Sequence, residues 1–272
     1  TPSNSSAASD VYKRQDMPFD YVVKVENNKV INDIDKLIKN NSKNKLKEKI
    51  DITVLQYENK NNNIYDGKSI LSEKDFNKIA KAKNIEVKDK INSRKEAYYF
   101  PRFLDKKNKI LNVNIGEENF KVVHSEERSL ANMMVLDNVL IVRDEEFIKL
   151  QNQIKKEKYA LYLVENHNRS VKLTKDFNSI ITNYEKSKND PKYRMVNSNY
   201  YENYIENISS SGTMLFIGCF VGLVFLVCMA SIIFFKQLSE AMEEKYRYKI
   251  LRNIGVRNKE LKSSIYLSLI HI

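Results

Sequence analysis

The chain contains an uninterrupted run of uncharged residues, Thr213–Phe235, in which most side chains are large and apolar. At about 1.5 Å per helical residue, Met214–Phe235 would extend roughly 33 Å, whereas the hydrocarbon core of a bilayer is about 30 Å thick. A buried helix of a water-soluble protein is rarely apolar on every side over this length. The run therefore predicts a transmembrane helix over residues 213–235 and a location in the cell membrane.

Basic residues are unevenly distributed around this span. Arg194 is the only Lys or Arg in the 20 residues before it, whereas eight Lys and Arg residues follow, from Lys236 to Lys262. Basic flanks remain on the cytoplasmic side of a membrane. The asymmetry therefore predicts that residues 16–212 form an extracytoplasmic domain and residues 236–266 a cytoplasmic segment.

Both ends of the chain have an unusual relationship at the DNA level. Asp10–Gln15 and Leu267–Ile272 can be encoded by sequences that are reverse complements of one another, and this repeat resembles a transposase-type sequencing adapter. Ser5–Ser9 fits the upstream continuation of the same adapter. We therefore expect residues 1–15 and 267–272 to be non-native, and the native protein to extend beyond both ends.

The predicted external domain is mildly basic and contains no cysteine. Residues 16–212 hold 36 Lys and Arg against 30 Asp and Glu, a net charge of about +6. This charge would attract anionic lipid headgroups, wall polymers or pyrophosphate groups. The alternative is a solvated surface of a Lys-rich and Asn-rich composition, as in Lys39–Lys49. A domain of this size buries enough apolar surface to fold without disulfides.

Apolar periodicity within residues 16–212 alternates between the strand and helix patterns. Predicted strands cover residues 19–26, 49–58, 110–115, 119–125, 138–143 and 159–165. Predicted helices cover residues 30–40, 73–83, 144–156 and 173–187, with Ser72 as the N-cap of the second. Residues 85–109 give no clear pattern and are predicted to be a linker or a lobe boundary. The fold class expected is a mixed α+β domain with helices covering one face of a sheet, followed by one transmembrane helix and a cytoplasmic helical segment.

The sequence contains no recognised motif for catalysis, cofactor binding or metal binding. The six glycines form neither a P-loop nor a dinucleotide fingerprint, and His124 and His167 lack metal-ligand spacing. The acidic pairs Glu126–Glu127 and Glu145–Glu146 are interpreted as solvated surface. We therefore predict a protein that is not itself an enzyme, with no cofactor, no metal and no nucleic-acid partner.

Two features flank or interrupt the predicted span. Gly218 and Gly222 form a GxxxG step, which either allows close packing of a second helix or arises by chance in an apolar sequence. The tyrosines Tyr200, Tyr201 and Tyr204 precede the span by one or two helical turns. They are expected either to form an aromatic belt at the outer membrane surface or to lie in solvent.

The segment after the span carries the most specific motif of the sequence. A helix continues out of the membrane, ends near Gly255 in the C-cap position and restarts after Asn258. The turn consists of Ile250, Leu251, Arg252, Asn253, Ile254, Gly255, Val256 and Arg257. With the span before it, this turn resembles the FtsX-like ABC transporter permeases, in particular the bacitracin-export type. Pro18–Val23 resembles the start of the large external domain of that family.

The resemblance implies a multi-pass permease with a large external domain between its seventh and eighth spans. It also implies a partner ABC ATPase dimer that docks on Ile250, Leu251, Arg252, Ile254, Gly255 and Arg257 and, in many members, a sensor histidine kinase. The implied ligand is a peptide antibiotic or its complex with a lipid pyrophosphate. The alternatives are an FtsX-like permease for lipoprotein export or control of cell-wall hydrolases, and a single-span receptor.

Overall fold

The computed structural model describes residues 14, 16–58, 68–87, 89–103, 112–132 and 135–270. These residues belong to two compact units that divide between Glu206 and Asn207. Nearly all of the sequence expected to be adapter-derived at the N-terminus, and the last two residues of the chain, lie outside the described residues.

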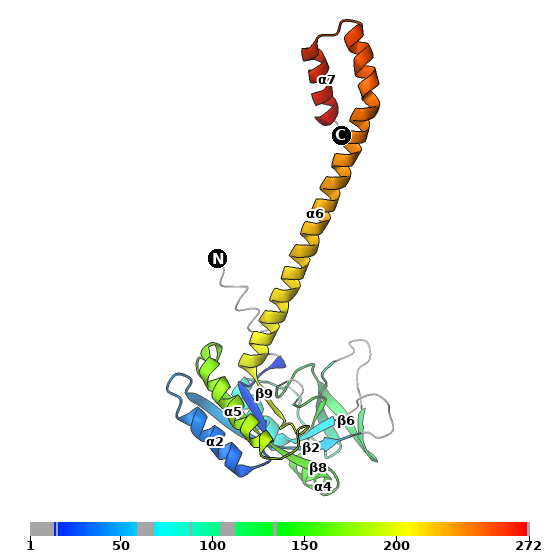
Figure 1. Cartoon of the computed structure of the whole chain (residues 1–272). Coiled ribbons are helices and arrows are strands. Elements are labelled where there is room, and N and C mark those ends of the chain that lie inside the picture. Colours follow the sequence, from blue (N-terminus) through cyan, green and yellow to red (C-terminus); the bar gives the residue numbers. More distant parts are fainter. Residues whose placement is uncertain are drawn as a thin grey trace. The chain divides into compact units, whose positions relative to one another are not determined.

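The first unit is built on one mixed sheet, which has nine strands among the described residues (Figure 1). The strands are β1 (Tyr21–Lys24), β2 (Leu46–Tyr57), β3 (Lys68–Ser72), β4 (Glu96–Phe100), β5 (Asn112–Ile115), β6 (Glu118–Ser125), β7 (Val139–Val142), β8 (Lys155–Val164) and β9 (Asn197–Asn199). Their order is β5-β6-β4-β7-β3-β2-β8-β1-β9. The β3–β7 and β4–β6 pairs are parallel and the other pairs are antiparallel. The predicted α+β class is confirmed.

Helices lie on both faces of this sheet, so the expectation that they cover only one face is wrong. The helices of the unit are α2 (Asn28–Lys39), α3 (Glu73–Lys83), α4 (Asp144–Leu150) and α5 (Val171–Lys186), with a short 3-10 helix η1 (His167–Arg169). The apolar residues of α3 pack in one core, and those of α2 and α5 pack in another. Alternate residues of β8 enter these two cores: Leu161 packs with α3, and Tyr162 with α2 and α5. A third core joins apolar residues of α4 to residues of the strands from β5 to β2 in the sheet order.

Residues 89–103 of the predicted linker or lobe boundary contain β4, which occupies the interior of the sheet between β6 and β7, so they are not a lobe boundary. Residues 104–109 of that prediction lie outside the described residues. The side chains of Ala97, Tyr98, Tyr99 and Phe100 are all buried. A strand buried on both faces lacks the alternation of apolar and polar residues that identifies a half-exposed strand. This is the physical reason that the pattern along the sequence did not indicate β4.

The predicted helix over residues 144–156 is too long. The helix α4 ends at Leu150, and Lys155 and Lys156 already belong to β8, where they pair with Gln56 and Leu55 of β2. Phe147, Leu150 and Ile154 are spaced as in a helix. The hydrogen bonds between β2 and β8 nevertheless place Lys155 and Lys156 in a strand. In contrast, Ser72 caps α3 as predicted, because its hydroxyl oxygen accepts a hydrogen bond from the Asp75 amide at 3.1 Å.

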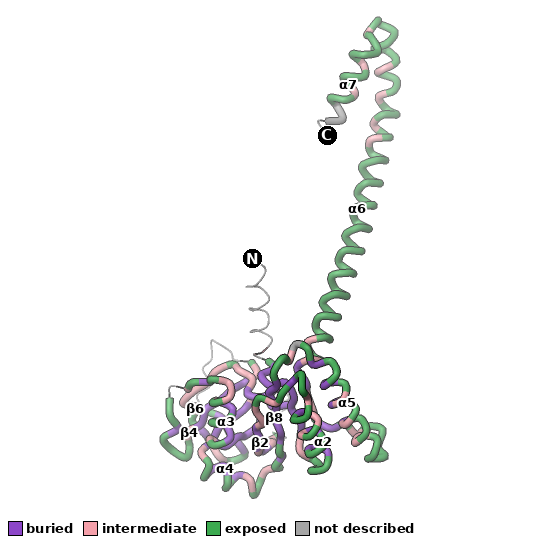
Figure 2. Tube along the Cα trace, turned by 90° about the vertical axis from the view of Figure 1, so that its left-hand side faces the viewer, coloured by how far each residue is buried: buried purple, intermediate pink, exposed green. Residues whose placement is uncertain are grey.

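The second unit consists of most of α6 (Tyr200–Asn253) and all of α7 (Asn258–Ile270). Among the described residues, α6 is the one helix long and apolar enough to cross a membrane. Its apolar residues from Met214 to Phe235 are exposed, in contrast to the buried core of the first unit (Figure 2). A water-soluble protein rarely exposes an apolar surface of this extent, so these side chains are suited to contact with lipid or with other helices.

Candidate functional site

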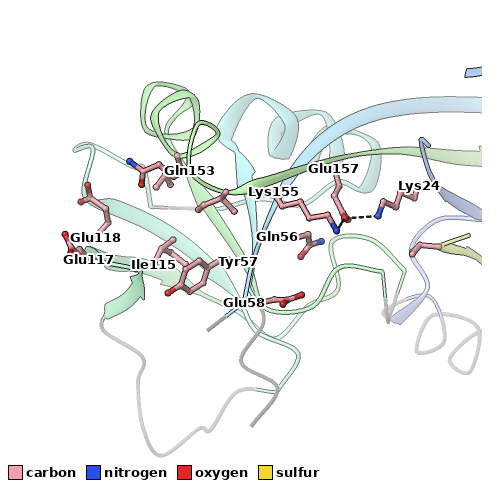
Figure 3. A pocket seen from close by; sticks show the side chains of 14 residues that line it. Lys24, Gln56, Tyr57, Glu58, Ile115, Glu117, Glu118, Gln153, Lys155 and Glu157 are labelled. Carbon is pink, nitrogen blue, oxygen red and sulfur yellow. Dashed lines mark hydrogen bonds and ion pairs between the residues drawn. The ribbon is translucent and has the colours of Figure 1, made fainter. Parts of the chain in front are cut away.

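A hollow of about 970 Å³ opens at one end of the sheet in the first unit (Figure 3). Its walls come from the ends of β1 and β2, the β5–β6 turn, the α4–β8 segment and the residue before β9. Ile115 and Leu150 supply a buried apolar floor, and Tyr57 and Ile154 supply half-buried surface. Charged side chains surround this surface. The hollow therefore offers both apolar and ionic contacts to a ligand.

Glu157 is the buried charge of the hollow, and it is held by three donors. Lys24 Nζ and Lys155 Nζ lie 2.7 and 2.9 Å from its Oε1 atom, and the Tyr159 hydroxyl donates to Oε2 at 2.8 Å. In Figure 3 the two lysines reach the carboxylate from opposite sides. Burial by itself raises the pKa of Glu157, but the hydrogen bonds from Lys24, Lys155 and Tyr159 outweigh it and lower the pKa to about 2.

We expect Glu157→Gln to destabilise the protein by roughly 1–3 kcal/mol at pH 7, since it removes the anion shared by Lys24 and Lys155 and leaves the largely buried Lys24 ammonium with Glu26 alone, at 3.8 Å. The folded-state pKa of about 2 lies below the ordinary value of 4.5. The ionised carboxylate therefore stabilises the fold above pH 4.5, and this contribution is lost as the pH falls towards 2. Unfolding by urea, followed by tyrosine fluorescence, should show a difference from wild type that shrinks over this interval.

The matched control for this prediction is Glu145→Gln. Glu145 pairs with Arg94 at 2.8 Å, but the two side chains are 57% and 69% exposed, so the loss should stay within about 0.5 kcal/mol. A Glu157→Gln effect that is no larger than this, or that does not change between pH 7 and pH 3, would contradict the assigned role of the buried carboxylate.

The end of the first unit connects β9 directly to α6. The Tyr200 amide donates to the Asp20 carbonyl oxygen at 2.8 Å. The Asn199 side-chain oxygen accepts from the Glu202 amide at 2.8 Å, which caps the first turn of α6, and the Asn199 side-chain amide donates to the Glu202 carboxylate at 2.7 Å. Tyr200 is buried and stacks with Tyr204. Tyr200 is thus part of the domain core, and its expected place in an aromatic belt or in solvent is corrected.

Asp20 connects the start of α6 to the end of β8. Its buried carboxylate accepts from the Val164 amide at 2.7 Å at the end of β8, while its backbone carbonyl holds Tyr200. Asn132, also buried, accepts from the Phe19 amide and donates to Ser198 of β9. Buried polar groups with their hydrogen bonds made are costly to displace. The first turn of α6 is therefore fixed to the sheet.

The predicted coupling residues lie together at the end of α6 and the start of α7. Gly255 has φ +96°, and its amide donates to Arg252 while the Val256 amide donates to Leu251, at 3.2 Å each. These two bonds form a Schellman motif, so the predicted C-cap is confirmed. Ile250, Leu251 and Ile254 expose 47%, 38% and 72% of their surface, and Arg257 precedes the first residue of α7. The motif leaves an apolar surface beside two arginines.

Gly218 and Gly222 lie one turn apart on α6. A side chain built at either position would meet no atom within 4 Å among the described residues. The backbone is therefore open to approach on this side of the helix, and helix packing at this position stays a prediction.

The hollow was not predicted from the sequence, although part of its signal is present there. Lys155, Glu157 and Tyr159 are spaced two apart, which places all three side chains on one face of a strand. The other contributors are distant in the sequence and give no local signal. The acidic pair Glu145–Glu146 also needs correction: Glu146 is buried and pairs with Lys149 at 3.3 Å, so only Glu145 is solvated.

Comparison with known proteins identifies ABC transporter permeases as relatives. The sequence is 25% identical over 248 residues to the ABC transporter permease protein YxdM of Bacillus subtilis, covering 88% of this chain and 38% of that protein. It is 43% identical over 54 residues to the bacitracin export permease protein BceB of Halalkalibacterium halodurans, covering 20% of this chain and 8% of that protein. The chain thus spans less than two fifths of the length of these relatives.

No protein-family model matches the sequence. A crystal structure of a Bacillus anthracis protein described as a lipoprotein matches with a TM-score of 0.43 and 14% identity, covering 58% of this chain and 90% of that one. This likeness is too low to support an argument. The permease relatives and the apolar helix α6 together indicate a membrane protein related to ABC transporter permeases.

Proposed function

We propose that this chain is part of the permease subunit of an FtsX-like, bacitracin-export type ABC transporter that acts in resistance to peptide antibiotics and in sensing them. The observation that carries the proposal is the similarity to an ABC transporter permease over 88% of the chain. The shorter and closer match to a bacitracin export permease supports the antibiotic class. The partners of such a permease are an ABC ATPase dimer, which hydrolyses ATP, and a sensor histidine kinase.

In this proposal each part of the chain has a separate role. Residues 16–212 recognise the ligand outside the cell, residues 213–235 cross the membrane, and residues 236–266 contact the ATPase in the cytoplasm. The Schellman turn at Gly255 supports the last role, because it combines exposed apolar side chains with arginine charge in a fixed backbone shape. A docking surface between proteins commonly has this composition.

Ligand recognition reaches the membrane helix through β9 in this proposal. The hydrogen bonds of Asn199, Asp20 and Asn132 fix the first turn of α6 to the sheet. A displacement of the sheet therefore moves this turn. The ligand must bind two positions of the domain with different affinity, because tight binding alone shifts no equilibrium.

The proposal is tested on the complete permease with its ATPase in lipid. We expect a peptide antibiotic, alone or with a lipid pyrophosphate, to change the rate of ATP hydrolysis, and deletion of residues 24–195 to abolish resistance in cells. Net charge of about +6 on residues 16–212 favours the peptide–pyrophosphate complex over free peptide when the domain acts as a whole. Unchanged ATP hydrolysis together with intact resistance after the deletion would refute the role in recognition. A lipoprotein that stimulates ATP hydrolysis where peptides do not would favour the export alternative.

A further inference from the structure

The hollow beside Glu157 differs in charge from the domain around it. Its described lining residues include four carboxylates, Glu58, Glu117, Glu118 and Glu157, and two lysines, Lys24 and Lys155. The lining residues alone thus carry two more negative than positive charges, whereas residues 16–212 as a whole are basic, and the lysines that pair with Glu118 lie outside the lining. Carboxylates without a lysine partner in the hollow would attract a cation locally, although the domain as a whole is positively charged.

The acids of the hollow are not equally available to a ligand. Glu118 is paired with Lys95 and Lys149. Glu58 and Glu117 form no salt bridge with another described residue, and both are exposed at the rim. In the part of the chain that the structure describes, a cationic ligand would thus meet these two carboxylates without breaking a salt bridge.

The buried carboxylate offers a further contact through exchange. Lys155 is 74% exposed, so its ammonium can return to water when another cation takes its place on Glu157. Lys24 is only 19% exposed and keeps its bond to the same carboxylate. An ammonium or guanidinium group of a ligand could therefore replace Lys155 without leaving a buried charge unpaired.

From these observations we infer that the hollow binds a cationic, amphipathic peptide segment. The apolar side chains of such a peptide would lie on Ile115, Ile154 and Tyr57, and its basic groups would contact Glu58, Glu117 and Glu157. This inference rests on the proposed function and deepens it. A peptide without a bound pyrophosphate would then have a binding site in the hollow, although the net positive charge of the domain repels a cationic peptide.

The position of the hollow also relates it to α6. Val196 lines the hollow, and its carbonyl oxygen accepts from the Lys24 amide at 2.9 Å. Strand β9 begins at the next residue and leads to Tyr200, the first residue of α6. Three residues therefore separate the hollow from the membrane helix along the chain, and β9 pairs only with β1 among the described strands. A ligand that contacts Val196 acts on the strand that holds the helix.

The test uses the full chain in nanodiscs of uncharged lipid and a fluorescent hexapeptide of alternating Lys and Leu. Fluorescence anisotropy, corrected with empty nanodiscs, should show saturable binding. The double variant Glu58→Gln, Glu117→Gln should weaken it at least about fivefold, on the scale of two exposed ion pairs. Lys155→Gln should strengthen binding about twofold or more, because it removes the ammonium group that would compete with the peptide for Glu157. The matched control Asp33→Asn, Glu165→Gln removes two exposed acids outside the hollow and should leave affinity within about twofold.

Several outcomes would overturn the inference. Equal affinity of wild type and the Glu58, Glu117 variant would place the peptide on lipid or on another face. Stronger binding of a Glu–Leu hexapeptide than of the Lys–Leu hexapeptide would show an anion site. If peptides stimulate ATP hydrolysis equally in wild type and the double variant, the hollow assignment fails and the proposed function stands. If the hollow binds as expected and no peptide affects ATP hydrolysis, the proposed function fails instead.

Discussion

Replacing Gly255 with valine is expected to reduce ligand-stimulated ATP hydrolysis by the complete transporter to its basal rate. The backbone at Gly255 has φ +96°, a region that L-residues avoid and β-branched residues avoid most strongly. The space around it is open, so the cost comes from the backbone and not from a clash. It is on the order of 1–2 kcal/mol, enough to shift the turn out of the Schellman conformation. The exposed Ile250 and Ile254 would then face a different direction from the start of α7.

The matched control is Gly255→Asn, because asparagine adopts positive φ more readily than other residues with a side chain. We expect this variant to keep most of the stimulation. Basal ATP hydrolysis and the amount of permease in the membrane fraction should be the same for both variants. Full stimulation of the valine variant would instead indicate that residues 236–266 lie on anionic lipid as an amphipathic helix.

The sequence was most informative where local interactions determine the structure. The ends of α3 and α6 were predicted at Ser72 and Gly255, because a cap depends on residues within one turn of itself. The apolar run in α6 likewise required no knowledge of the rest of the chain. Both caps have their hydrogen-bond partners within one or two turns along the chain, and the apolar run is recognised by its own composition and length.

The sequence did not predict strands whose position is determined by pairing with partners that are distant along the chain. The strands β3 and β4 are buried on both faces, and β9 is a run of three polar residues held by its register with β1. None of them has an alternating pattern. The hollow is a further example, since Lys24, Glu117 and Glu157 meet only because the sheet brings their strands and turns together. Its acidic character inside a basic domain could not be seen in total charge.

The direction of the membrane crossing remains a prediction with an all-or-none readout. Before the span, the 20 residues from Tyr193 to Gly212 hold one basic residue, and after it the chain carries eight from Lys236 to Lys262. Lys and Arg residues within about 15–20 residues of a span favour the cytoplasmic side, whereas long domains cross the membrane largely regardless of their charge. We therefore expect α2 to be outside the cell and α7 inside.

Single cysteines at Asn32 on α2 and at Asn258 on α7 test this orientation, since both positions are exposed. The background carries Cys219→Ala and Cys228→Ala, which removes the two native cysteines of the chain. In intact cells a membrane-impermeant thiol reagent should label position 32 and leave position 258 unlabelled. After permeabilisation it should label both, which shows that each thiol can react. Labelling of position 258 but not of position 32 in intact cells would show the opposite orientation. The hollow would then face the cytoplasm, where it could not meet an antibiotic arriving from outside.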